Sequence, residues 1–569
     1  MALLLAGATK GEAARDPAGA GLAEAPSELI VGLAAGVSDA EGNQLLAAAG
    51  APAERKLRRV AARLARVDPA RLDAVLRRLR SDPRVRFAEP NYKLHALAMP
   101  NDTAVGQLWG LVNSGQAIKG VAGTPDADID ADQAWGVSTG SSSVVVGVID
   151  TGVDFSHPDL GGSMTSSSVM WTNPGETGGG RESNGVDDDA NGYVDDWRGW
   201  DWANDDNNPQ DDMSHGTHVA GTIGALGNNG QGVAGVNWNV KIMALKFLDS
   251  VGNGDLADAV EALRYATTMG ARITNNSWGG GGFSQAMFDA IKAADLRGAL
   301  FVAAAGNSAA NNDAAPVYPA SYDVPNVISV AATDQDDVLA SFSNRGRASV
   351  DLGAPGTQVY STIPGGGYDW YSGTSMASPH VAGTAALAAA AFPGATGAGL
   401  KALLLRTVDP KASLTGVTAT EGRLNAGRAL TCVGSPKTWI ESPKPGFSVA
   451  LNDSVAVTVL ATNCADPAGV NVTANVAGFP VALTARGDGL YTGTYTPAAG
   501  GAVTLTATAT VGALTDSQSV AGTVDGGYRL LQEPFAWLDA TVGGTRLTLA
   551  DDAQATVALP FSFRYYGQP

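Results

Sequence analysis

The pattern of apolar and polar residues over the first 90 positions combines strand and helix periods. Residues 28–33 form a short apolar run, residues 85–89 alternate as a half-buried strand does, and residues 69–80 repeat apolar positions at helical spacing. We expect strands at 28–33, around 56, at 63–67 and at 85–89, with helices at 39–49 and 69–80. This β-α-β-β-α-β order predicts a compact α+β module.

The pattern changes near residue 100 to apolar runs that alternate with helical segments. Strands are expected at 143–149, 242–246, 273–276, 300–304 and 327–331, and helices at 255–269 and 285–296. The alanine-rich run 381–392 is too short for a membrane span and predicts a buried helix. Continuous apolar strands separated by helices indicate an α/β domain, in which helices cover both faces of a parallel sheet.

Helical patterns end at about Gly434. Short runs rich in Val, Thr and Ala, such as 454–461 and 502–508, are separated by Gly, Asn and Asp. They predict a small Ig-like β-sandwich over residues 434–525. The tail at 526–569 again contains strand-like runs, and we expect it to be an incomplete β domain.

The first eight residues, from Met1 to Ala8, are almost all apolar. They are similar to the end of a signal peptide that lacks its basic start, so residues 1–27 are interpreted as a leader. No window reaches the roughly 18 apolar residues that a membrane helix requires. We therefore expect a secreted or cell-surface protein without a transmembrane segment.

Charge is distributed unevenly over a chain whose net charge is −19. Residues 51–100 contain 13 Lys and Arg against 5 Asp and Glu, a net charge of +8, whereas residues 101–569 carry −23. An acidic body of this kind argues against a nucleic-acid partner, because nucleic-acid binding proteins normally present a basic face. The basic segment ahead of the acidic body requires an explanation of its own.

The chain contains two cysteines, Cys432 and Cys464, both near the predicted start of the sandwich. In an oxidising compartment they can form one disulfide, but two cysteines do not define a disulfide framework. Two unpaired, buried thiols are an equally good interpretation, and the sequence leaves both open.

Five histidines limit the choice of a catalytic base. The segment His215-Gly-Thr-His218 places two of them three positions apart, whereas a zinc-binding H-E-x-x-H helix needs four positions and a glutamate. Zinc chemistry is therefore excluded for this segment on both the spacing and the missing acid.

A serine and an aspartate stand at positions suited to catalysis. Ser375 opens the apolar helical run, where the helix dipole favours developing negative charge, although a serine there can also be a plain helix cap. Asp150 ends the apolar run 143–149, the end of a strand at which α/β sheets place function, although Asp-Thr-Gly also suits a turn. An α/β-hydrolase elbow is excluded, because Ala377 replaces its second glycine and only His380 follows the serine. An aspartic protease needs a second Asp-Thr-Gly, which the sequence lacks.

Three segments taken together resemble the signature blocks of the subtilisin family. They are Val148-Ile-Asp-Thr-Gly-Val-Asp, Ser214-His-Gly-Thr-His-Val-Ala-Gly-Thr and Gly373-Thr-Ser-Met-Ala-Ser-Pro-His-Val-Ala-Gly, in the family's order of Asp, His and Ser. The resemblance implies a subtilisin-like domain at residues 99–433 that acts as a secreted, bacterial, monomeric serine endopeptidase on protein or peptide substrates. In it Ser375 is the nucleophile, His215 the general base and Asp150 the residue that orients the histidine.

The resemblance also implies the residues that bind the substrate and the oxyanion. Asn307, in Phe301-Val-Ala-Ala-Ala-Gly-Asn307, supplies one oxyanion donor, and the backbone N–H of Ser375 supplies the other. Val317 is placed near the floor of a pocket for a neutral, medium-to-large apolar P1 side chain. Two glycine-rich edges pair with the substrate backbone: Gly252, Asn253 and Gly254, and Ser277, Trp278, Gly279 and Gly280.

Calcium is the expected cofactor, in a structural role, with no catalytic metal. Asp187, Asp189 and Asn191 present oxygens at alternate positions, and the glycine that follows completes the opening of a calcium loop. The closing glutamate is replaced by Arg198, so Asp195 or Asp196 is expected to take its place, and a solvated acidic loop is the alternative. Separately, Asp159 and Asn229 match positions that hold a structural calcium in many subtilisins.

Residues 28–98 resemble, more loosely, the inhibitory propeptide of the family, best at Val85-Arg-Phe-Ala-Glu-Pro-Asn-Tyr. We therefore expect an autoprocessed zymogen that is cut between about His95 and Met99 and is inhibited by its own basic module. Two other functions are considered: a catalytically inactive binding protein, against which the complete set of catalytic residues argues, and an adhesive protein whose β domains are its main function.

Overall fold

The computed structural model describes residues 28–34, 36–57, 62–68, 71–91, 99–162, 168–432 and 434–525. The predicted leader at 1–27, most of the expected cleavage segment, at 92–98, and the β-like tail at 526–569 lie outside these ranges.

The N-terminal module has the predicted order of elements. They are β1 (Glu28–Leu33), α1 (Asp39–Ala49), β2 (Ala53–Lys56), β3 (Ala62–Arg66), α2 (Leu72–Arg80) and β4 (Val85–Pro90). The strands form an antiparallel sheet in the order β2-β3-β1-β4. The side chains of Leu29 and Val31 on β1 pack against Leu46 of α1 and Val75 and Leu79 of α2. The predicted α+β module is therefore confirmed.

A nine-stranded sheet forms the centre of the second part of the chain, in the order β16-β17-β13-β12-β11-β10-β7-β9-β8. Its pairs are parallel except β16 with β17. The strands are β7 (Val145–Asp150), β8 (Gly199–Asp201), β9 (Lys241–Lys246), β10 (Ile273–Asn276), β11 (Leu300–Ala304), β12 (Val327–Thr333), β13 (Leu352–Pro355), β16 (Asp409–Pro410) and β17 (Gly422–Arg423).

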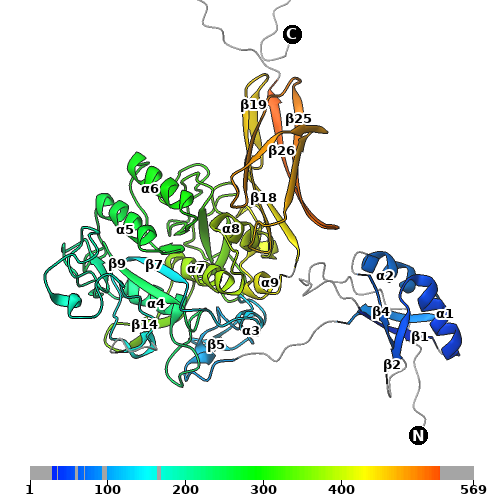
Figure 1. Ribbon diagram of the computed structural model, residues 1–569, viewed down its shortest axis with the longest axis horizontal. Helices are drawn as coiled ribbons and strands as arrows, with labels where there is room; N and C mark the ends of the chain where they lie inside the picture. Colours follow the sequence, from blue (N-terminus) through cyan, green and yellow to red (C-terminus); the bar gives the residue numbers. More distant parts are fainter. Residues whose placement is uncertain are drawn as a thin grey trace, which may run out of the picture. The chain divides into compact units, whose positions relative to one another are not determined.

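Helices cover both faces of this sheet, as the pattern of continuous apolar runs in the sequence predicted (Figure 1). On one face lie α4 (His215–Gly224), α7 (Thr374–Ala391) and α8 (Gly397–Arg406), and on the other lie α5 (Leu256–Thr268) and α6 (Gln285–Leu296). Because residues along each strand point alternately to the two faces, Val146 and Val148 of β7 join the first core and Ile149 joins the second. Among the residues that the structure describes, no helix has the length and apolar character needed to cross a membrane.

Helix α7 begins at Thr374, one position before Ser375, with which the helical run was predicted to open. Pro379 lies inside the helix, and a proline has no N–H to donate to the carbonyl four residues earlier. That carbonyl belongs to Ser375, and it accepts a hydrogen bond of 2.8 Å from the hydroxyl of Ser277 instead. The side chain of Ser277 thus replaces the missing helical donor and ties the first turn of α7 to the end of β10.

The predicted β-sandwich follows and consists of two sheets. One has the order β18-β20-β24-β23 and the other β19-β26-β25-β21-β22. The strands are β18 (Pro436–Ser442), β19 (Phe447–Ala450), β20 (Val455–Asn463), β21 (Asn471–Val476), β22 (Phe479–Val481), β23 (Leu483–Ala485), β24 (Leu490–Tyr495), β25 (Gly501–Val511) and β26 (Leu514–Asp525). Ile440, Val459 and Leu505 are among the residues that fill the space between the sheets.

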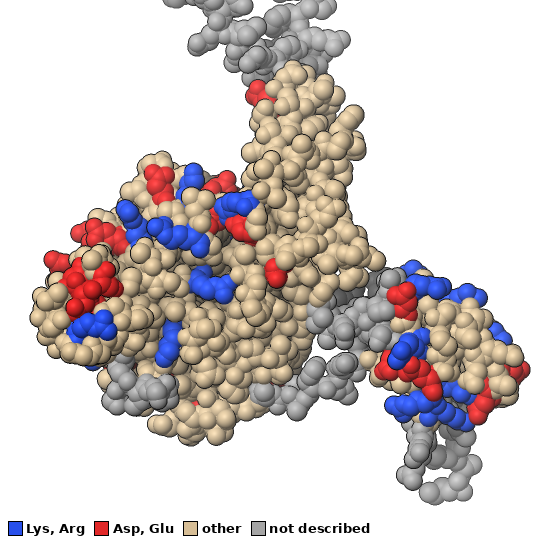
Figure 2. Space-filling model, viewed as in Figure 1, with Lys and Arg blue, Asp and Glu red and all other residues tan. Residues whose placement is uncertain are grey.

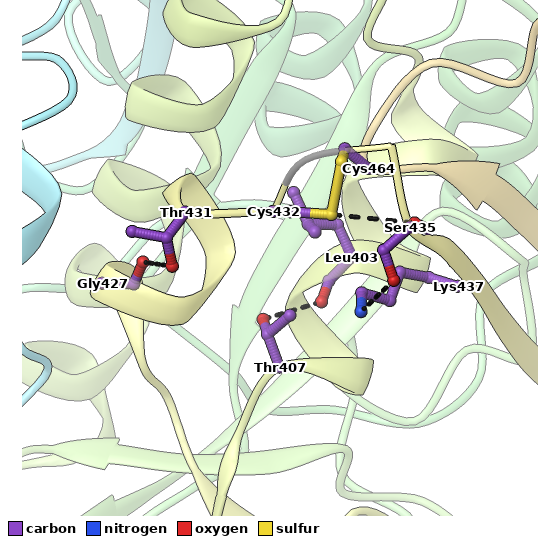
Figure 3. The surroundings of a disulfide bond; sticks show 8 residues. All are labelled: Leu403, Thr407, Gly427, Thr431, Cys432, Ser435, Lys437 and Cys464. Atoms are coloured by element: carbon purple, nitrogen blue, oxygen red, sulfur yellow. Dashed lines mark hydrogen bonds between the residues drawn. A yellow bond between two sulfur atoms is a disulfide. The ribbon is translucent and has the colours of Figure 1, made fainter. Parts of the chain in front are cut away.

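The sandwich is bonded to the end of the α/β domain by a disulfide (Figure 3). Cys432 follows α9 (Ala426–Leu430), Cys464 follows β20, and their Cα atoms are 5.5 Å apart. This bond settles the question that the sequence left open. Helix α8 contacts β18 and β20, and Trp439 and Leu460 of these strands belong to the same hydrophobic core as α8.

Candidate active site

The carboxyl ends of adjacent parallel strands bring the predicted catalytic residues to one edge of the sheet. Asp150 is the last residue of β7, and β7 lies between β9 and β10. Ser277 directly follows β10, and Asn307 follows β11, the next strand along. This edge is where open α/β sheets place their binding and catalytic groups.

Asp150 and His215 form a hydrogen-bonded pair at this edge. The Nδ1 atom of His215, the first residue of α4, lies 2.7 Å from Oδ1 of Asp150. The Asp150 side chain is 0% exposed and that of His215 is 20% exposed, so only the histidine reaches the surface. Since a carboxylate only accepts, Nδ1 carries the proton, and the lone pair of Nε2 is left available as a base.

The pKa of His215 is raised above its ordinary value of 6.5. Burial is the largest single influence and lowers this pKa, but the charge and hydrogen bond of Asp150 outweigh it, with a further contribution from the charge of Asp211. His218, one turn further along α4, has its pKa lowered to about 3, chiefly by burial, and its Nε2 lies 3.0 Å from the carbonyl oxygen of Val359. His218 is therefore a neutral packing residue.

Ser375 is held at the first turn of α7, on the same edge. Its hydroxyl donates to the carbonyl oxygen of Ser277 at 3.0 Å, and its own carbonyl accepts from the hydroxyl of Ser277. The side chain is only partly buried, whereas the residues that follow it in α7 are fully buried. The backbone of Ser375 is thus held in place by the helix and by Ser277, while its partly exposed hydroxyl is accessible to a ligand.

The side-chain nitrogen of Asn307 and the backbone nitrogen of Ser375 both lie beside Gly373. The side-chain oxygen of Asn307 accepts from the backbone N–H and the hydroxyl of Thr374, at 2.8 and 2.9 Å, which fixes the amide with its NH₂ pointing away. A Cβ atom placed on Gly373 would lie 3.4 Å from Nδ2 of Asn307 and 3.6 Å from the nitrogen of Ser375. The missing side chain of Gly373 leaves open the space that both donors face.

Val317 lies between two segments of small residues. Its Cγ1 atom would be 3.6 Å from a Cβ placed on Gly279 and 3.6 Å from one placed on Gly306. Gly279 of the predicted edge and Gly306, directly before Asn307, therefore both lie beside Val317 without a side chain of their own.

The two predicted substrate edges meet at a cavity of about 370 Å³. Gly252, Asn253 and Gly254 line one side of it, and Trp278, Gly279 and Gly280 line the other. The remaining walls are mainly apolar and include Leu256, Ala259, Met287, Tyr318 and Tyr322. The cavity suits a large apolar side chain, because no Lys, Arg, Asp or Glu is among its lining residues.

Two carboxylates of the predicted calcium loop form a cluster with a third from a preceding segment, which was not predicted from the sequence. Ligand atoms of Glu176, Asp187 and Asp189 lie within 4.8 Å of one another. Glu176 is buried, one of its oxygens accepts from the backbone N–H of Asp188 and Asp189, and its Oε2 atom has no hydrogen-bond partner among the described residues. A cation bound by the three carboxylates would satisfy that oxygen, so the donors fit calcium.

The other predicted residues of this loop face different partners. The carboxylate of Asp196 accepts from the amides of Asn173 and Asn191 and from the hydroxyl of Tyr265. The side-chain oxygen of Asn191 accepts from the backbone N–H of Tyr193. Glu176 precedes the loop by 11 positions in an irregular segment, where no periodicity in the sequence indicates it.

At the second predicted calcium position, Asp159 and Asn229 are in contact. Oδ1 of Asp159 accepts from the Asn229 amide at 2.9 Å, and Oδ2 accepts from the N–H of Val233 and the hydroxyl of Tyr368. Asp102, which the sequence analysis did not select, accepts from the N–H of Asn229 at 3.4 Å, and burial raises its pKa. Three oxygen-bearing side chains are thus gathered at this point.

Comparison with known proteins identifies the family. Residues 141–427 match the subtilase family of peptidases, and residues 17–91 match the fervidolysin N-terminal prodomain. The chain belongs to the subtilase family, and it is a subtilisin-like serine endopeptidase with an N-terminal prodomain.

Its curated relatives are proteases. The chain is 37% identical over 405 residues to the thermophilic serine proteinase of Bacillus sp. strain AK1, covering 71% of this chain and 87% of that one. It is 37% identical over 302 residues to thermitase of Thermoactinomyces vulgaris, covering 53% and 93%. It is 36% identical over 387 residues to an extracellular protease of Xanthomonas campestris pv. campestris, covering 64% and 62%.

Proposed function

We propose that the chain is a secreted zymogen whose protease domain hydrolyses peptide bonds through Ser375, His215 and Asp150. The observation that carries this proposal is the hydrogen bond from His215 to the buried Asp150. It lies at the same sheet edge as Ser277, to whose carbonyl oxygen the hydroxyl of Ser375 donates. Secretion is supported by the relative described as extracellular and by the presence of a disulfide, which persists in oxidising compartments.

In the proposed reaction the hydroxyl of Ser375 turns from Ser277 and attacks the scissile carbonyl carbon, while Nε2 of His215 takes its proton. The C–N bond then breaks as His215 gives that proton to the leaving amine, and an acyl-enzyme on Ser375 remains. Water, deprotonated by the same nitrogen, attacks the ester carbon, and the bond to Ser375 breaks as His215 returns the proton to the serine oxygen. Asp150 keeps the imidazole in the required tautomer and stabilises its charged form.

Asn307 and the backbone N–H of Ser375 are proposed to bind the oxyanion of each tetrahedral intermediate. Their convergence beside Gly373 supports this assignment, because both donors are held in place before the substrate arrives. The backbone of the substrate would pair with Gly252–Gly254 and Ser277–Gly280 as an added strand. Its P1 side chain would enter the slot at Val317 and be neutral, and an apolar residue further upstream would fill the larger cavity.

The decisive test is the variant Ser375→Ala. We expect it to lose both hydrolysis of fluorogenic peptides and release of the N-terminal module, because a single nucleophile serves both reactions. A Ser375→Ala protein that still frees its own prodomain would refute autoprocessing through this serine. A peptide-library profile dominated by Arg or Lys at P1 would refute the proposed pocket.

Residues 28–98 are proposed to inhibit the enzyme after cleavage between about His95 and Met99. Charge supports this, since the basic prodomain precedes an acidic body, and Figure 2 shows several patches of Lys and Arg side chains on the visible face of the module, with Asp and Glu beside some of them. Opposite charge would aid encounter more than final affinity. The isolated module, added to the mature enzyme, should inhibit it more strongly at low salt than at high salt. Absence of inhibition at either salt concentration would refute the proposal.

Calcium is proposed to bind at Glu176, Asp187 and Asp189 and, separately, at Asp159 and Asn229. Each group gathers oxygen donors on adjacent loops, so a bound cation would tie those loops together and stabilise the folded state. Neither group includes Ser375, His215 or Asp150, and calcium would have no part in the chemical steps.

A further inference from the structure

The carboxylate of Asp211 is buried beside the catalytic pair but belongs to none of the motifs. It lies in the loop before α4 and is 4% exposed. Its Oδ1 accepts from the hydroxyl of Thr151 at 2.9 Å and from the N–H of Met213 and Ser214 at 3.0 and 2.8 Å. Its Oδ2 accepts from the N–H and the hydroxyl of Thr217, at 2.8 and 2.6 Å.

These donors stand directly beside the two catalytic residues. Thr151 follows Asp150 and donates its backbone N–H to Oδ1 of Asp150 at 2.8 Å. On the other side, Ser214 precedes His215, and the N–H of Gly216 donates to the hydroxyl of Thr151 at 2.9 Å. One carboxylate therefore connects the loop after β7 with the first turn of α4.

The first turn of α4 depends on Asp211 because its own N-cap residue does not cap it. Ser214 has a left-handed backbone with φ of 101°, and its side chain makes no capping hydrogen bond to the helix. Its hydroxyl is bonded instead to the hydroxyl of Tyr371. Asp211 supplies the missing acceptor for Thr217, and its negative charge at the helix N-terminus is favourable. Without it, a strained residue next to His215 would lose the bonds that hold it.

We propose that Asp211 is a positioning residue of the active site, which holds His215 in line with Asp150 by binding the segments on which both side chains stand. The inference rests on the proposed catalytic role of the pair. It concerns a residue that touches neither substrate nor reacting atoms and acts through His215.

Asp211 also acts on His215 through its charge. The groups that interact electrostatically with the imidazole are Asp150 at the end of β7, Asp211 before α4, and the neutral His218 within α4. Both aspartates favour the protonated imidazole. Activity requires the neutral form, so removal of the Asp211 charge should move the acid limb of kcat/KM to lower pH.

The test compares Asp211→Asn with a control, Asp205→Asn, which removes an exposed carboxylate from the same loop between β8 and α4. An amide has one accepting oxygen and cannot satisfy the five donors, so His215 should lose its alignment. We expect kcat per titrated active site to fall about 100-fold in Asp211→Asn, with KM changed far less. The acid limb should move to lower pH in this variant and stay in place in the control.

A third variant, Thr151→Val, separates position from charge, because it removes the hydroxyl bonded to Asp211 and Gly216 but keeps the carboxylate. Its kcat should fall while its acid limb stays where it is in the wild type. An Asp211→Asn enzyme with wild-type kcat, or with lost activity but an unmoved acid limb, overturns the proposal. If Asp211→Asn is not recovered folded, an unchanged kcat in Thr151→Val overturns it.

Titration of the wild-type enzyme with a serine-reactive inhibitor keeps this test distinct from that of the proposed function. If the wild type is not labelled at Ser375, the catalytic assignment itself fails. If the wild type is labelled and the variants behave as the wild type does, only the role of Asp211 fails.

Discussion

Removal of the charge of Glu441 should strongly destabilise the protein, because a buried lysine depends on it. Glu441, on β18, lies 2.9 Å from Nζ of Lys401 on α8 and 2.6 Å from Nζ of Lys444. It also accepts from the indole N–H of Trp439 at 3.1 Å. The side chains of Lys401 and Glu441 are 1% and 5% exposed, whereas Lys444 is 29% exposed and can turn to water.

The variant Glu441→Gln preserves the shape of the side chain but leaves Lys401 as an unpaired buried cation. Breaking a buried pair in this way costs about 3–5 kcal/mol, whereas replacing both partners by apolar residues is often close to neutral. We therefore expect Glu441→Gln to lower the free energy of unfolding by about 3–5 kcal/mol. The double variant Lys401→Met, Glu441→Leu should lose much less, and Lys444→Gln, which keeps the buried pair, serves as the control.

The effect should depend on pH. Burial is the largest single influence on the pKa of Glu441 and raises it, but the charges and hydrogen bonds of Lys401 and Lys444 outweigh it and lower the pKa from 4.5 to about 2. A lowered pKa in the folded state adds stability that is fully present above the unfolded value and is lost as pH falls through the folded value. The difference between wild type and Glu441→Gln should shrink between about pH 4.5 and 2.

The assay is urea unfolding, followed by tryptophan fluorescence, of enzyme first inactivated by a serine-reactive inhibitor so that it cannot digest itself. Equal stability of the wild type and Glu441→Gln at pH 7 would refute the reasoning. So would a double variant as unstable as Glu441→Gln, because the loss would then come from packing and not from an unpaired charge.

Further predictions concern the active site, the disulfide and calcium. Asn307→Ala should lower kcat about 100- to 1000-fold with little change in KM, measured by steady-state peptide hydrolysis, and an unchanged kcat would exclude it as an oxyanion donor. Because the pKa of His215 is raised, the acid limb of kcat/KM should have its midpoint above pH 6.5, and a midpoint well below it would contradict the ionised carboxylate beside it. Replacing Cys432 and Cys464 together by Ala opens a loop of 32 residues and should lower the free energy of unfolding in urea by about 3–4 kcal/mol. An unchanged free energy of unfolding would contradict the disulfide. Millimolar calcium should raise Tm over that in excess chelator, and Glu176→Gln should reduce the rise; identical Tm values in both buffers would refute the sites.

The parallel sheet and the positions of the catalytic residues could be predicted from the sequence because both depend on local signals. Apolar runs such as 143–149 predict buried strands, and a polar residue at the carboxyl end of such a run, as Asp150 is, falls at the edge where neighbouring strands also end. The resemblance of the serine and histidine blocks to the subtilisin family then assigned Ser375 and His215, which lie at the starts of α7 and α4. The strand order that joins them was not needed for the assignment.

The features that the sequence did not reveal depend on contacts between distant segments. Helix α7 continues through Pro379 because Ser277, 98 positions before Ser375, supplies the hydrogen bond that Pro379 cannot. Glu176 and Asp211 precede their partners in irregular loops, where no periodicity predicts which way a side chain points. The pairing of Cys432 with Cys464 depends on how β20 packs against α8, which only the folded chain determines.

Labelling of the catalytic serine tests the proposed chemistry most directly. The mature enzyme would be treated with a fluorophosphonate, and its intact mass and peptide map would be compared with residual peptidase activity. We predict one adduct per molecule, located on Ser375, with activity lost in proportion to labelling, and neither adduct nor activity in Ser375→Ala. An adduct on another residue, or peptidase activity that survives complete labelling of Ser375, would contradict the assignment of this serine, with His215 and Asp150, as the catalytic centre.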